Sequence, residues 1–446
     1  MMDLFQHQIK SMRCETLNQV QGDRKEFLEL FPEGGKKMKN LKFGVCIIFL
    51  ISFVLFPLTA FSAAKKDKIV IGMSTSLTGP LAIIRSAGFQ PIYEMWVEEV
   101  NKAGGIYVKE YGKKLPIELK IYDDKSDLGT MTRLTEKLIT EDKVDFLFSA
   151  CGTAMLFAQA PIANKYGYIL IGEEGGSRSL QKFKSDFPYF FSVLNTDVQQ
   201  MPVLAKIFAD VGVKTVAITY IEDLHGTEYS GTAAEEFKAK GMNVVWVKSH
   251  PPDAKDLTPI LKTAQAANVD AFCCFSYPDQ TIAVTGQAMG IGYSPKAFFL
   301  SVGPYAPFFR DIFKPAGVEG IMGCGAWNEK SAPAAKEFSD KYKARFKQDP
   351  NYWGGTIFYA SLQILQQAIE RAGALNQKKI RDIMATEKFK TVLGQTWFDG
   401  TFYALSCYPG EIGQWQKGVF EVIDPGEKRT AKPEYPKPAW PAPPKK

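Results

Sequence analysis

Residues 144–177 constrain the fold of this chain more than any other stretch, because two apolar runs, a helical segment and two polar loops follow one another without interruption. Segments 144–148 and 168–171 have the length and composition of buried strands. The segment between them, 153–165, is apolar and rich in alanine, as in a buried helix. This order predicts a parallel sheet that is covered by helices on both faces.

The two polar loops of this stretch are predicted to lie side by side at one edge of the sheet. Residues 149–153 follow the first strand and 172–177 follow the second, and open α/β sheets bind ligands at the carboxyl ends of their strands. Thr153 stands at the predicted N-cap of the helix, where a hydroxyl and free backbone N–H groups suit an anion, most simply a carboxylate. Ordinary strand–helix connections of doubly wound domains share these features, so both interpretations are open on these residues alone.

The strand–helix alternation continues along the chain and indicates two lobes of one α/β architecture. Further strands are predicted at 68–74, 117–123, 190–194, 215–220, 243–248, 271–275 and 297–301. Further helices are predicted at 88–103, 131–141, 198–211, 227–240, 257–267 and 281–289. The C-terminal part adds helices at 332–346, 355–373 and 377–386, and short edge strands at 395–398 and 419–423. These last elements cannot form a core alone, so they must complete both lobes.

The predicted lobes are built from separated parts of the sequence. The first lobe comprises residues 65–194 with 327–395, and the second comprises 195–326 with 396–423. Together they hold about 360 residues, which exceeds what a single hydrophobic core comfortably accommodates. The chain crosses between the lobes more than once, which predicts a stiff hinge of several strands rather than a free linker.

The two ends of the chain are predicted to lie outside these lobes. Residues 38–64 have the pattern of a secretory signal peptide that starts at Met38: a positively charged N-terminal region, an apolar core and a cleavage region of small residues. Its apolar run is too short and too interrupted for a membrane anchor. Residues 1–37 are then an upstream extension of the natural start, and 424–446 form a proline-rich, extended tail.

Composition excludes several classes of function. The formal net charge is +6 and no basic run occurs, so neither nucleic acid nor a membrane surface is an expected partner. The cysteine pattern is no disulfide framework, although a bridge between Cys324 and Cys407 is one alternative in an oxidising compartment. With two histidines after the signal peptide and no hydrolase, phosphate-loop or zinc motif, an enzyme is not expected. No metal and no cofactor are expected, and a hydrolase is the rejected alternative.

Several stretches in order give this chain a resemblance to a known family. It resembles the type I periplasmic solute-binding proteins of ABC importers, specifically the branched-chain (Leu/Ile/Val) amino acid group. The resemblance covers about residues 68–423 and rests on IVIGMSTSLTGPLA (69–82), EEVNKAGGI (98–106), IYDDKSD (121–127), residues 144–172, VAITYIEDLHG (216–226), VDAFCCFSYPDQT (269–281), GGTIFYASLQILQQAIERAG (354–373) and GQTWFDGTF (394–402).

The resemblance implies a ligand closed between two lobes and a set of site residues. Thr153 matches the position whose hydroxyl contacts a ligand carboxylate in amino acid binders. Glu174 and Gly176 match the next loop, which supplies contacts to the polar end of the ligand. His225 and Tyr277 match two positions, usually aromatic, that line the pocket from the second lobe.

One departure from the family pattern leaves the ligand open. The loop 301–305 contains no acidic residue, although binders of α-amino acids usually have one there to pair with the ammonium group. Either Glu173 or Glu174 supplies this charge from the first lobe, or the ligand is an aromatic or aliphatic carboxylic acid without an ammonium group. The resemblance implies a soluble periplasmic monomer that delivers its ligand to an ABC permease. A ligand sensor for a receptor is the alternative of another class.

Overall fold

The computed structural model describes residues 66–325, 327–403 and 410–441. The predicted upstream extension and signal peptide lie outside the described residues. Cys407, one half of the alternative Cys324–Cys407 bridge, lies outside them as well. The four described cysteines, Cys151, Cys273, Cys274 and Cys324, are buried free thiols.

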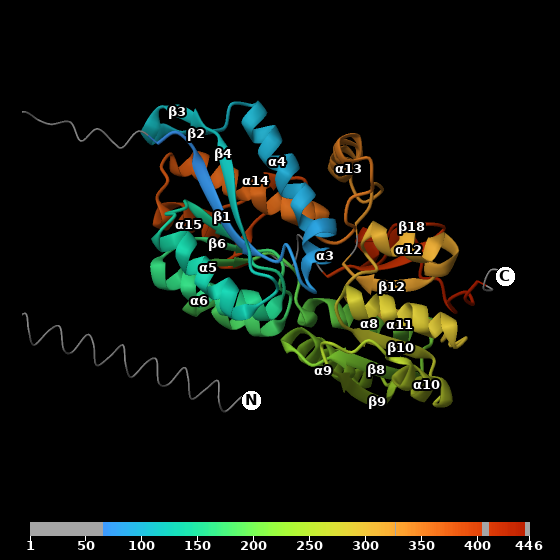
Figure 1. Ribbon diagram of the computed structural model, residues 1–446. Coiled ribbons are helices and arrows are strands. Elements are labelled where there is room, and N and C mark those ends of the chain that lie inside the picture. Colours follow the sequence, from blue (N-terminus) through green and yellow to red (C-terminus); the bar gives the residue numbers. More distant parts are fainter. Residues whose placement is uncertain (1–65, 326, 404–409, 442–446) are drawn as a thin grey trace, which may run out of the picture. The chain divides into compact units, whose positions relative to one another are not determined.

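The described chain is organised around two seven-stranded sheets (Figure 1). The first has the order β15-β16-β7-β6-β5-β1-β4. Its strands are β1 (Ile69–Thr75), β4 (Ile117–Asp123), β5 (Phe146–Phe148), β6 (Leu170–Gly172), β7 (Phe190–Ser192), β15 (Phe398–Asp399) and β16 (Phe402–Tyr403). All neighbouring strands are parallel except β15 and β16, which form an antiparallel pair at the edge.

Helices cover both faces of the first sheet, as the apolar strand composition predicts. They are α3 (Ala82–Ile84), α4 (Gln90–Lys102), α5 (Leu128–Thr140), α6 (Thr153–Tyr166), α7 (Phe183–Asp186), α13 (Pro333–Phe346), α14 (Gly354–Ala372) and α15 (Gln377–Thr386). Strand β5 shows why both faces are buried: Phe146 and Phe148 belong to the core cluster that includes α4 and α14, whereas Leu147 belongs to the cluster of α5 and α6. Successive strand residues point to opposite faces, so an all-apolar strand needs cover on each side.

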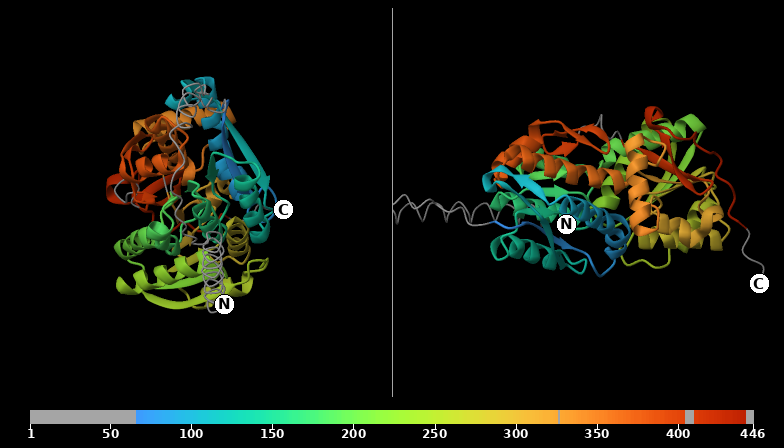
Figure 2. Two further views of the ribbon diagram at one scale, coloured as in Figure 1. Left: turned by 90° about the vertical axis from the view of Figure 1, so that its left-hand side faces the viewer. Right: turned by 90° about the horizontal axis from the view of Figure 1, so that it is seen from above.

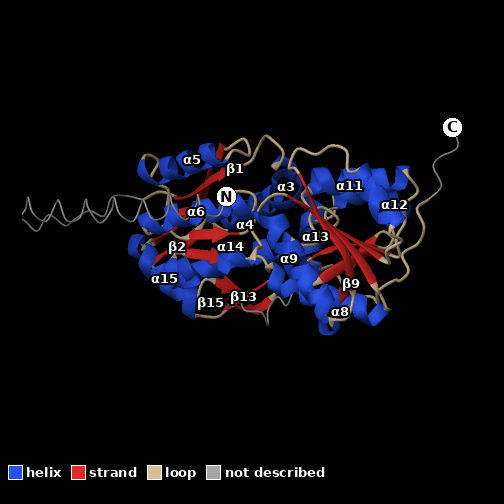
Figure 3. Cartoon of the chain, turned by 90° about the horizontal axis from the view of Figure 1, so that it is seen from below, coloured by secondary structure: helices blue, strands red, loops and turns tan. Residues whose placement is uncertain are grey.

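The second sheet has the order β18-β17-β12-β11-β10-β8-β9. Its strands are β8 (Thr215–Ile221), β9 (Asn243–His250), β10 (Ala271–Phe275), β11 (Ala297–Leu300), β12 (Ile321–Cys324), β17 (Ile412–Gln416) and β18 (Val419–Asp424). Its helices are α8 (Asp197–Val211), α9 (Leu224–Ala239), α10 (Thr258–Ala266), α11 (Pro278–Gly290) and α12 (Pro307–Val318). Figure 3 shows these strands gathered between helices, and only β17 and β18 run antiparallel to their neighbours.

The chain passes from one sheet to the other three times: after β7, after β12 and after β16. The C-terminal segments therefore complete both sheets, as predicted, and Figure 2 shows orange and red elements on both. The predicted change of lobe at residue 395/396 differs from the observed topology, because β15 and β16 still pair within the first sheet.

Several elements are absent from the sequence-based prediction. These include the hairpin of β2 (Ile106–Val108) and β3 (Lys113–Leu115), strand β13 (Phe389–Thr391), helix α12 and strands β12 and β17. The predicted edge strand 395–398 overlaps two short strands, β14 (Gly394–Thr396) and β15. The predicted helix 88–103 also begins too late, because helical structure starts at α3 and continues through a π-helical turn, Arg85–Phe89, into α4. Pro91 in the first turn of α4 suits a helix start, which hid the earlier turns from pattern analysis.

The proline-rich segment after β18 lies against the second sheet. Trp440 packs edge-on against Phe298 and donates a 2.6 Å hydrogen bond from Nε1 to the Tyr293 carbonyl. The Lys437 side chain is buried beside them and its ammonium lies over the Trp440 ring. Within the residues that the structure describes, no helix has the length and apolar character to cross a membrane.

Candidate functional site

A small cavity lies where loops of the first sheet meet loops and helices of the second. About 40 Å³ of it is open to the centres of water-sized molecules, which is room for only a few waters. All five residues that the sequence predicted for the site, Thr153, Glu174, Gly176, His225 and Tyr277, line this one cavity.

Thr153 is the first residue of α6 and not its N-cap, which corrects the sequence-based assignment. The N-cap is Gly152, whose φ of +97° favours glycine and whose missing side chain leaves the helix start without a side-chain cap. The helix start lines the cavity through Gly152 and Thr153, the Thr153 backbone N–H contacts the Tyr277 hydroxyl, and Thr153 is 2% exposed. This arrangement has the positive end of a helix dipole and a hydroxyl at one wall of the cavity.

Gly176 allows a close approach that no other residue would tolerate. A Cβ atom at this position would lie 2.7 Å from the Asn195 carbonyl oxygen and 2.8 Å from the Tyr229 hydroxyl. The Gly176 carbonyl accepts a hydrogen bond from the Asp197 N–H at the start of α8. The loop after β6 is thus pressed against the second-lobe side of the cavity wall.

Glu173 and Glu174 are neighbours in sequence but differ in environment. Glu173 is fully buried; one of its carboxyl oxygens accepts a hydrogen bond from the Tyr93 hydroxyl, and the other lies within hydrogen-bond distance of the Ser361 hydroxyl, which also contacts the Phe358 carbonyl. Glu174 lines the cavity; its carboxylate oxygens accept from no N–H or O–H group among the described residues, and the Cys151 thiol is its weak hydrogen-bonding neighbour. Burial raises the pKa of Glu173 to about 8 and that of Glu174 to about 7, and nearby Arg85 opposes both increases.

His225 and Tyr277 stand together on the second-lobe side of the cavity. Their rings stack with centroids 5.3 Å apart, and His225 Nε2 lies 3.1 Å from the Ser301 hydroxyl oxygen. That hydroxyl lies 3.1 Å from the Ser276 carbonyl, which can only accept, so the imidazole Nε2–H is the donor to Ser301. Burial lowers the pKa of His225, which keeps the ring neutral.

The Tyr277 hydroxyl reaches across the cavity to the start of α6. A Cβ atom on Gly152 would lie 3.7 Å from this hydroxyl. Burial raises the pKa of Tyr277 well above its usual value, and a hydrogen bond from the Thr153 backbone acts in the opposite direction. Tyr277 is therefore a neutral hydroxyl at the same helix end where the sequence predicts an anion.

Most of the apolar cavity wall was not predicted from the sequence. It comes from distant segments and consists of Ile84, Phe89, Leu194, Tyr229, Val302, Tyr305, Trp353 and Phe358. Asn351 contributes a polar side chain whose Oδ1 accepts hydrogen bonds from the Trp353 and Gly354 N–H groups at the start of α14. The loop that contains Tyr305 follows β11 at its carboxyl end, which is the one sequence signal that could have identified it.

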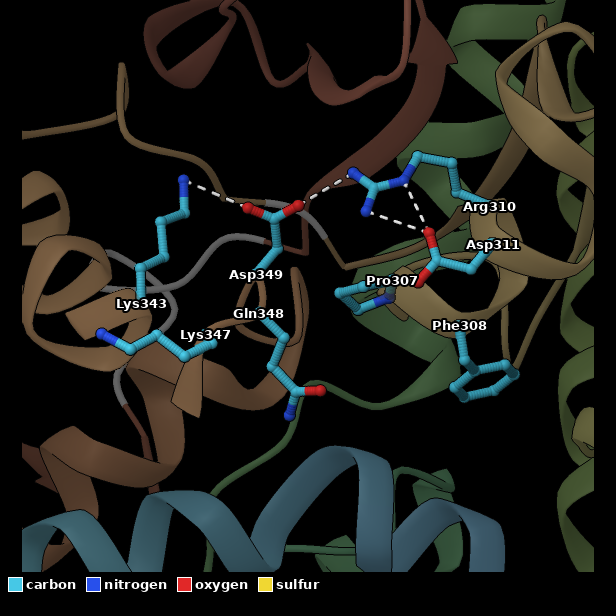
Figure 4. A pocket seen from close by; sticks show the side chains of 8 residues that line it. All are labelled: Pro307, Phe308, Arg310, Asp311, Lys343, Lys347, Gln348 and Asp349. Atoms are coloured by element: carbon cyan, nitrogen blue, oxygen red, sulfur yellow. Dashed lines mark hydrogen bonds and ion pairs between the residues drawn. The ribbon is translucent and has the colours of Figure 1, made fainter. Parts of the chain in front are cut away.

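A second, larger hollow is a surface groove and not a comparable site. It is lined by residues of α12, α13 and the loop that follows α13, and Figure 4 shows Arg310 and Lys343 both pointing toward Asp349. Asp349 forms ion pairs of 2.8 Å with Arg310 and 3.1 Å with Lys343. Because these three charged side chains pair with one another, the groove offers a ligand few unpaired charged groups.

Comparison with known proteins identifies the family. Residues 68–415 match the family model described as periplasmic binding protein, and the chain belongs to this family. Among curated relatives, Leu/Ile/Val-binding protein homolog 8 from Brucella suis biovar 1 (strain 1330) is 24% identical over 85% of this chain and 96% of its own length. Homolog 7 from Brucella abortus (strain 2308) is 22% identical over 77% of this chain and 88% of its own length.

Solved structures confirm the predicted fold of two parallel-sheet lobes. The branched-chain amino acid transporter substrate-binding protein LivJ from Streptococcus pneumoniae, in complex with isoleucine, matches with a TM-score of 0.69 and 22% identity over 80% of this chain and all of its own. A solute-binding protein of an ABC transporter from Rhodopseudomonas palustris BisB5, in complex with 3,4-dihydroxybenzoic acid, matches with a TM-score of 0.65 and 19% identity. That match covers 82% of this chain and 95% of the other. The resemblance inferred from the sequence is thereby confirmed.

Proposed function

We propose that this protein captures a small carboxylate-bearing ligand between its two lobes in the periplasm and delivers it to an ABC permease. The observation that carries the proposal is the pair of opposite polar groups on one cavity: the start of α6 with Thr153, which has no side-chain cap, and the buried carboxylate of Glu174, which accepts from no N–H or O–H group among the described residues. The first suits a carboxylate and the second suits an ammonium group. A hydrophobic α-amino acid, such as a branched-chain one, carries both.

The remaining wall supports the same ligand class. Phe89, Tyr305 and Phe358 contribute aromatic surface, and among the described lining residues Glu174 is the one carboxylate and no lysine or arginine is present. Ligand sites of this kind combine a mostly apolar lining with a few convergent polar groups. The curated relatives are named for Leu, Ile and Val, which agrees with this assignment.

A second candidate ligand is an aromatic carboxylic acid without an ammonium group. The rings of His225, Tyr229 and Tyr277 support it, because the centroids of the two tyrosine rings lie 4.5 Å and 5.3 Å from that of His225, and the three form an aromatic wall. The relative from Rhodopseudomonas palustris was crystallised with such an acid. In this case Glu174 would be protonated when the ligand is bound.

Calorimetric titration with three probes distinguishes the candidates. L-Leucine has both charges, 4-methylpentanoate is the same skeleton without the ammonium group, and 3,4-dihydroxybenzoate is an aromatic acid. The proposal predicts that L-leucine binds most tightly at pH 7.5, and that a several-hundred-fold excess over its dissociation constant raises stability by about 3–4 kcal/mol. Tighter binding of 3,4-dihydroxybenzoate would favour the second candidate, and binding of none of the three would contradict the carboxylate proposal.

A further inference from the structure

Two segments that belong to different lobes contact each other beside the cavity. The 3₁₀ helix η3 (Arg178–Lys182) follows β6 of the first sheet, whereas α9 follows β8 of the second. Each segment continues from the cavity wall, because Gly176 lies just before η3, and His225 and Tyr229 lie in the first turns of α9. Contacts between η3 and α9 therefore join the two lobes next to the cavity.

Glu228 on α9 binds the second residue of η3 with both of its carboxylate oxygens. Oε2 accepts a 3.0 Å hydrogen bond from the Ser179 N–H, and Oε1 accepts from the Ser179 hydroxyl. Ser179 is 8% exposed and Glu228 is partly buried, so both hydrogen bonds are shielded from water. Hydrogen bonds to an ionised acceptor are stronger than those between neutral groups, and a low local dielectric strengthens them further.

Arg178, the first residue of η3, lies along the same side of α9. A Cβ atom on Gly231 would lie 3.9 Å from Arg178 Nη2, and Gly231 is three residues after Glu228. Residues three apart in a helix share a face, so η3 follows one face of α9. The Arg178 N–H also donates a 2.6 Å hydrogen bond to Asp197 Oδ1 at the start of α8. Helix α6 of the first lobe packs against α9 as well, so α9 is the element that the second lobe presents to the first on this side.

We propose that Arg178, Ser179 and Glu228 form an interlobe clasp, which holds the two lobes together and sets the fraction of the protein in which they are closed. The hydrogen bonds of Glu228 join segments that belong to separate sheets, so they exist only while η3 and α9 lie together. Glu228 does not line the described cavity. It is therefore a positioning residue, which acts by holding α9 and its two cavity residues against the first lobe. The interlobe clasp goes beyond the proposed function because it acts without any ligand.

Replacement of Glu228 by alanine should release the interlobe clasp. Glu228→Ala removes both hydrogen bonds to Ser179, and alanine has the highest helix propensity, so α9 should stay folded. A hydrogen bond to a charged group shifts an equilibrium by roughly tenfold to hundredfold, and the ratio of open to closed protein should rise by about this factor. Small-angle scattering of the ligand-free protein measures the change. The radius of gyration of the wild type should match that of the described structure, and Glu228→Ala should have a larger one.

An acid on the same helix provides the matched control. Glu235 lies two turns after Glu228, its side chain is 73% exposed, and its carboxylate is 3.9 Å from Arg178. Glu235→Ala removes the same charge from α9 and should leave the radius of gyration unchanged. Glu228→Gln should give an intermediate radius, because its amide oxygen can accept from the Ser179 N–H and its N–H can donate to the Ser179 hydroxyl oxygen, but the charge is lost.

A variant on the other lobe tests whether the two residues act together. Ser179→Ala removes the hydroxyl and keeps the N–H, so it should enlarge the radius less than Glu228→Ala does. In the double variant Ser179→Ala/Glu228→Ala the serine change should add nothing, because its partner is already absent. Urea unfolding of each variant shows whether both lobes remain folded, which separates lobe opening from loss of structure.

Three results would overturn the proposal. The first is equal radii of gyration in folded wild type, Glu228→Ala and Ser179→Ala. The second is an equal enlargement in Glu235→Ala, and the third is a ligand-free wild type that is already as extended as Glu228→Ala.

Ligand release gives a second readout. L-Leucine should dissociate from Glu228→Ala roughly tenfold to hundredfold faster than from wild type, and from Glu235→Ala at the wild-type rate. If L-leucine does not bind the wild type, the proposed ligand is wrong, and the ligand-free radii still decide the role of Glu228.

Discussion

Replacement of Glu173 by glutamine tests the reasoning on the buried acid most directly. Glu173 has a pKa of about 8 in the folded protein against a usual value of 4.5, because burial disfavours its charged form. Between these values the folded state holds one proton that the unfolded state has released, so the free energy of unfolding falls as pH rises. The stabilising contribution of the Glu173 proton is fully present below pH 4.5 and is lost progressively up to about pH 8.

The magnitude follows from the size of the shift. At about 1.4 kcal/mol per pH unit, a shift of this size lowers the free energy of unfolding by about 5 kcal/mol in total, of which about 3–4 kcal/mol falls between pH 5 and pH 8. Glu173→Gln cannot ionise, yet its amide reproduces the neutral acid: its oxygen accepts from Tyr93, and its N–H donates to the Ser361 hydroxyl oxygen when the Ser361 proton is donated to the Phe358 carbonyl. The variant should therefore match wild type near pH 5 and exceed its stability by about 3–4 kcal/mol at pH 8.

Equilibrium urea unfolding at pH 5, 6, 7, 8 and 9 measures this difference. Glu141→Gln is the matched control, because Glu141 is exposed and forms no ion pair among the described residues; its stability difference from wild type should not change with pH. If the wild-type and Glu173→Gln stability curves run parallel across this pH range, Glu173 does not hold a proton in the folded state and the reasoning is wrong.

Three further predictions concern the ligand site and export. Thr153 is the first residue of α6 and not its cap, so Thr153→Ala should cause little loss of stability. The variant should weaken carboxylate binding by roughly tenfold to hundredfold, whereas Thr153→Ser should bind like wild type. Unchanged affinity in Thr153→Ala would show that Thr153 does not contact the ligand. Gly176→Ala places a Cβ 2.7 Å from a carbonyl oxygen of the opposing wall, so it should cost about 1–3 kcal/mol and enlarge the radius of gyration in small-angle scattering, and an unaltered radius and melting temperature would contradict this. Expressed from Met38 in a Gram-negative host, the protein should be recovered from the periplasm with a new N-terminus within residues 63–65, whereas an uncleaved membrane-bound chain would refute the signal peptide.

Local pattern sufficed to locate most of the regular structure. Strands Ile117–Asp123 and Ala271–Phe275 and helix Gln377–Thr386 have the bounds that the sequence predicts. Period-two and period-3.6 spacing of apolar residues reflects which side of an element is buried, and this property depends only on neighbours in sequence. The strands β2, β3 and β12, which escaped prediction, are three or four residues long and too short to show a period.

The sequence by itself determined the α/β class, the two-lobed organisation, the family resemblance and five residues that share one cavity. Only the tertiary structure decided that Gly152 and not Thr153 caps α6, that β15 and β16 join the first sheet, and that Arg85 lies buried behind the site. The cap of α6 depends on the backbone conformation at Gly152. The pairing of β15 and β16 at the sheet edge and the burial of Arg85 depend on contacts between residues far apart in sequence. The state of Glu173 and Glu174 belongs to the same category, since two adjacent glutamates are equivalent in the sequence and differ only through what the folded chain places around each.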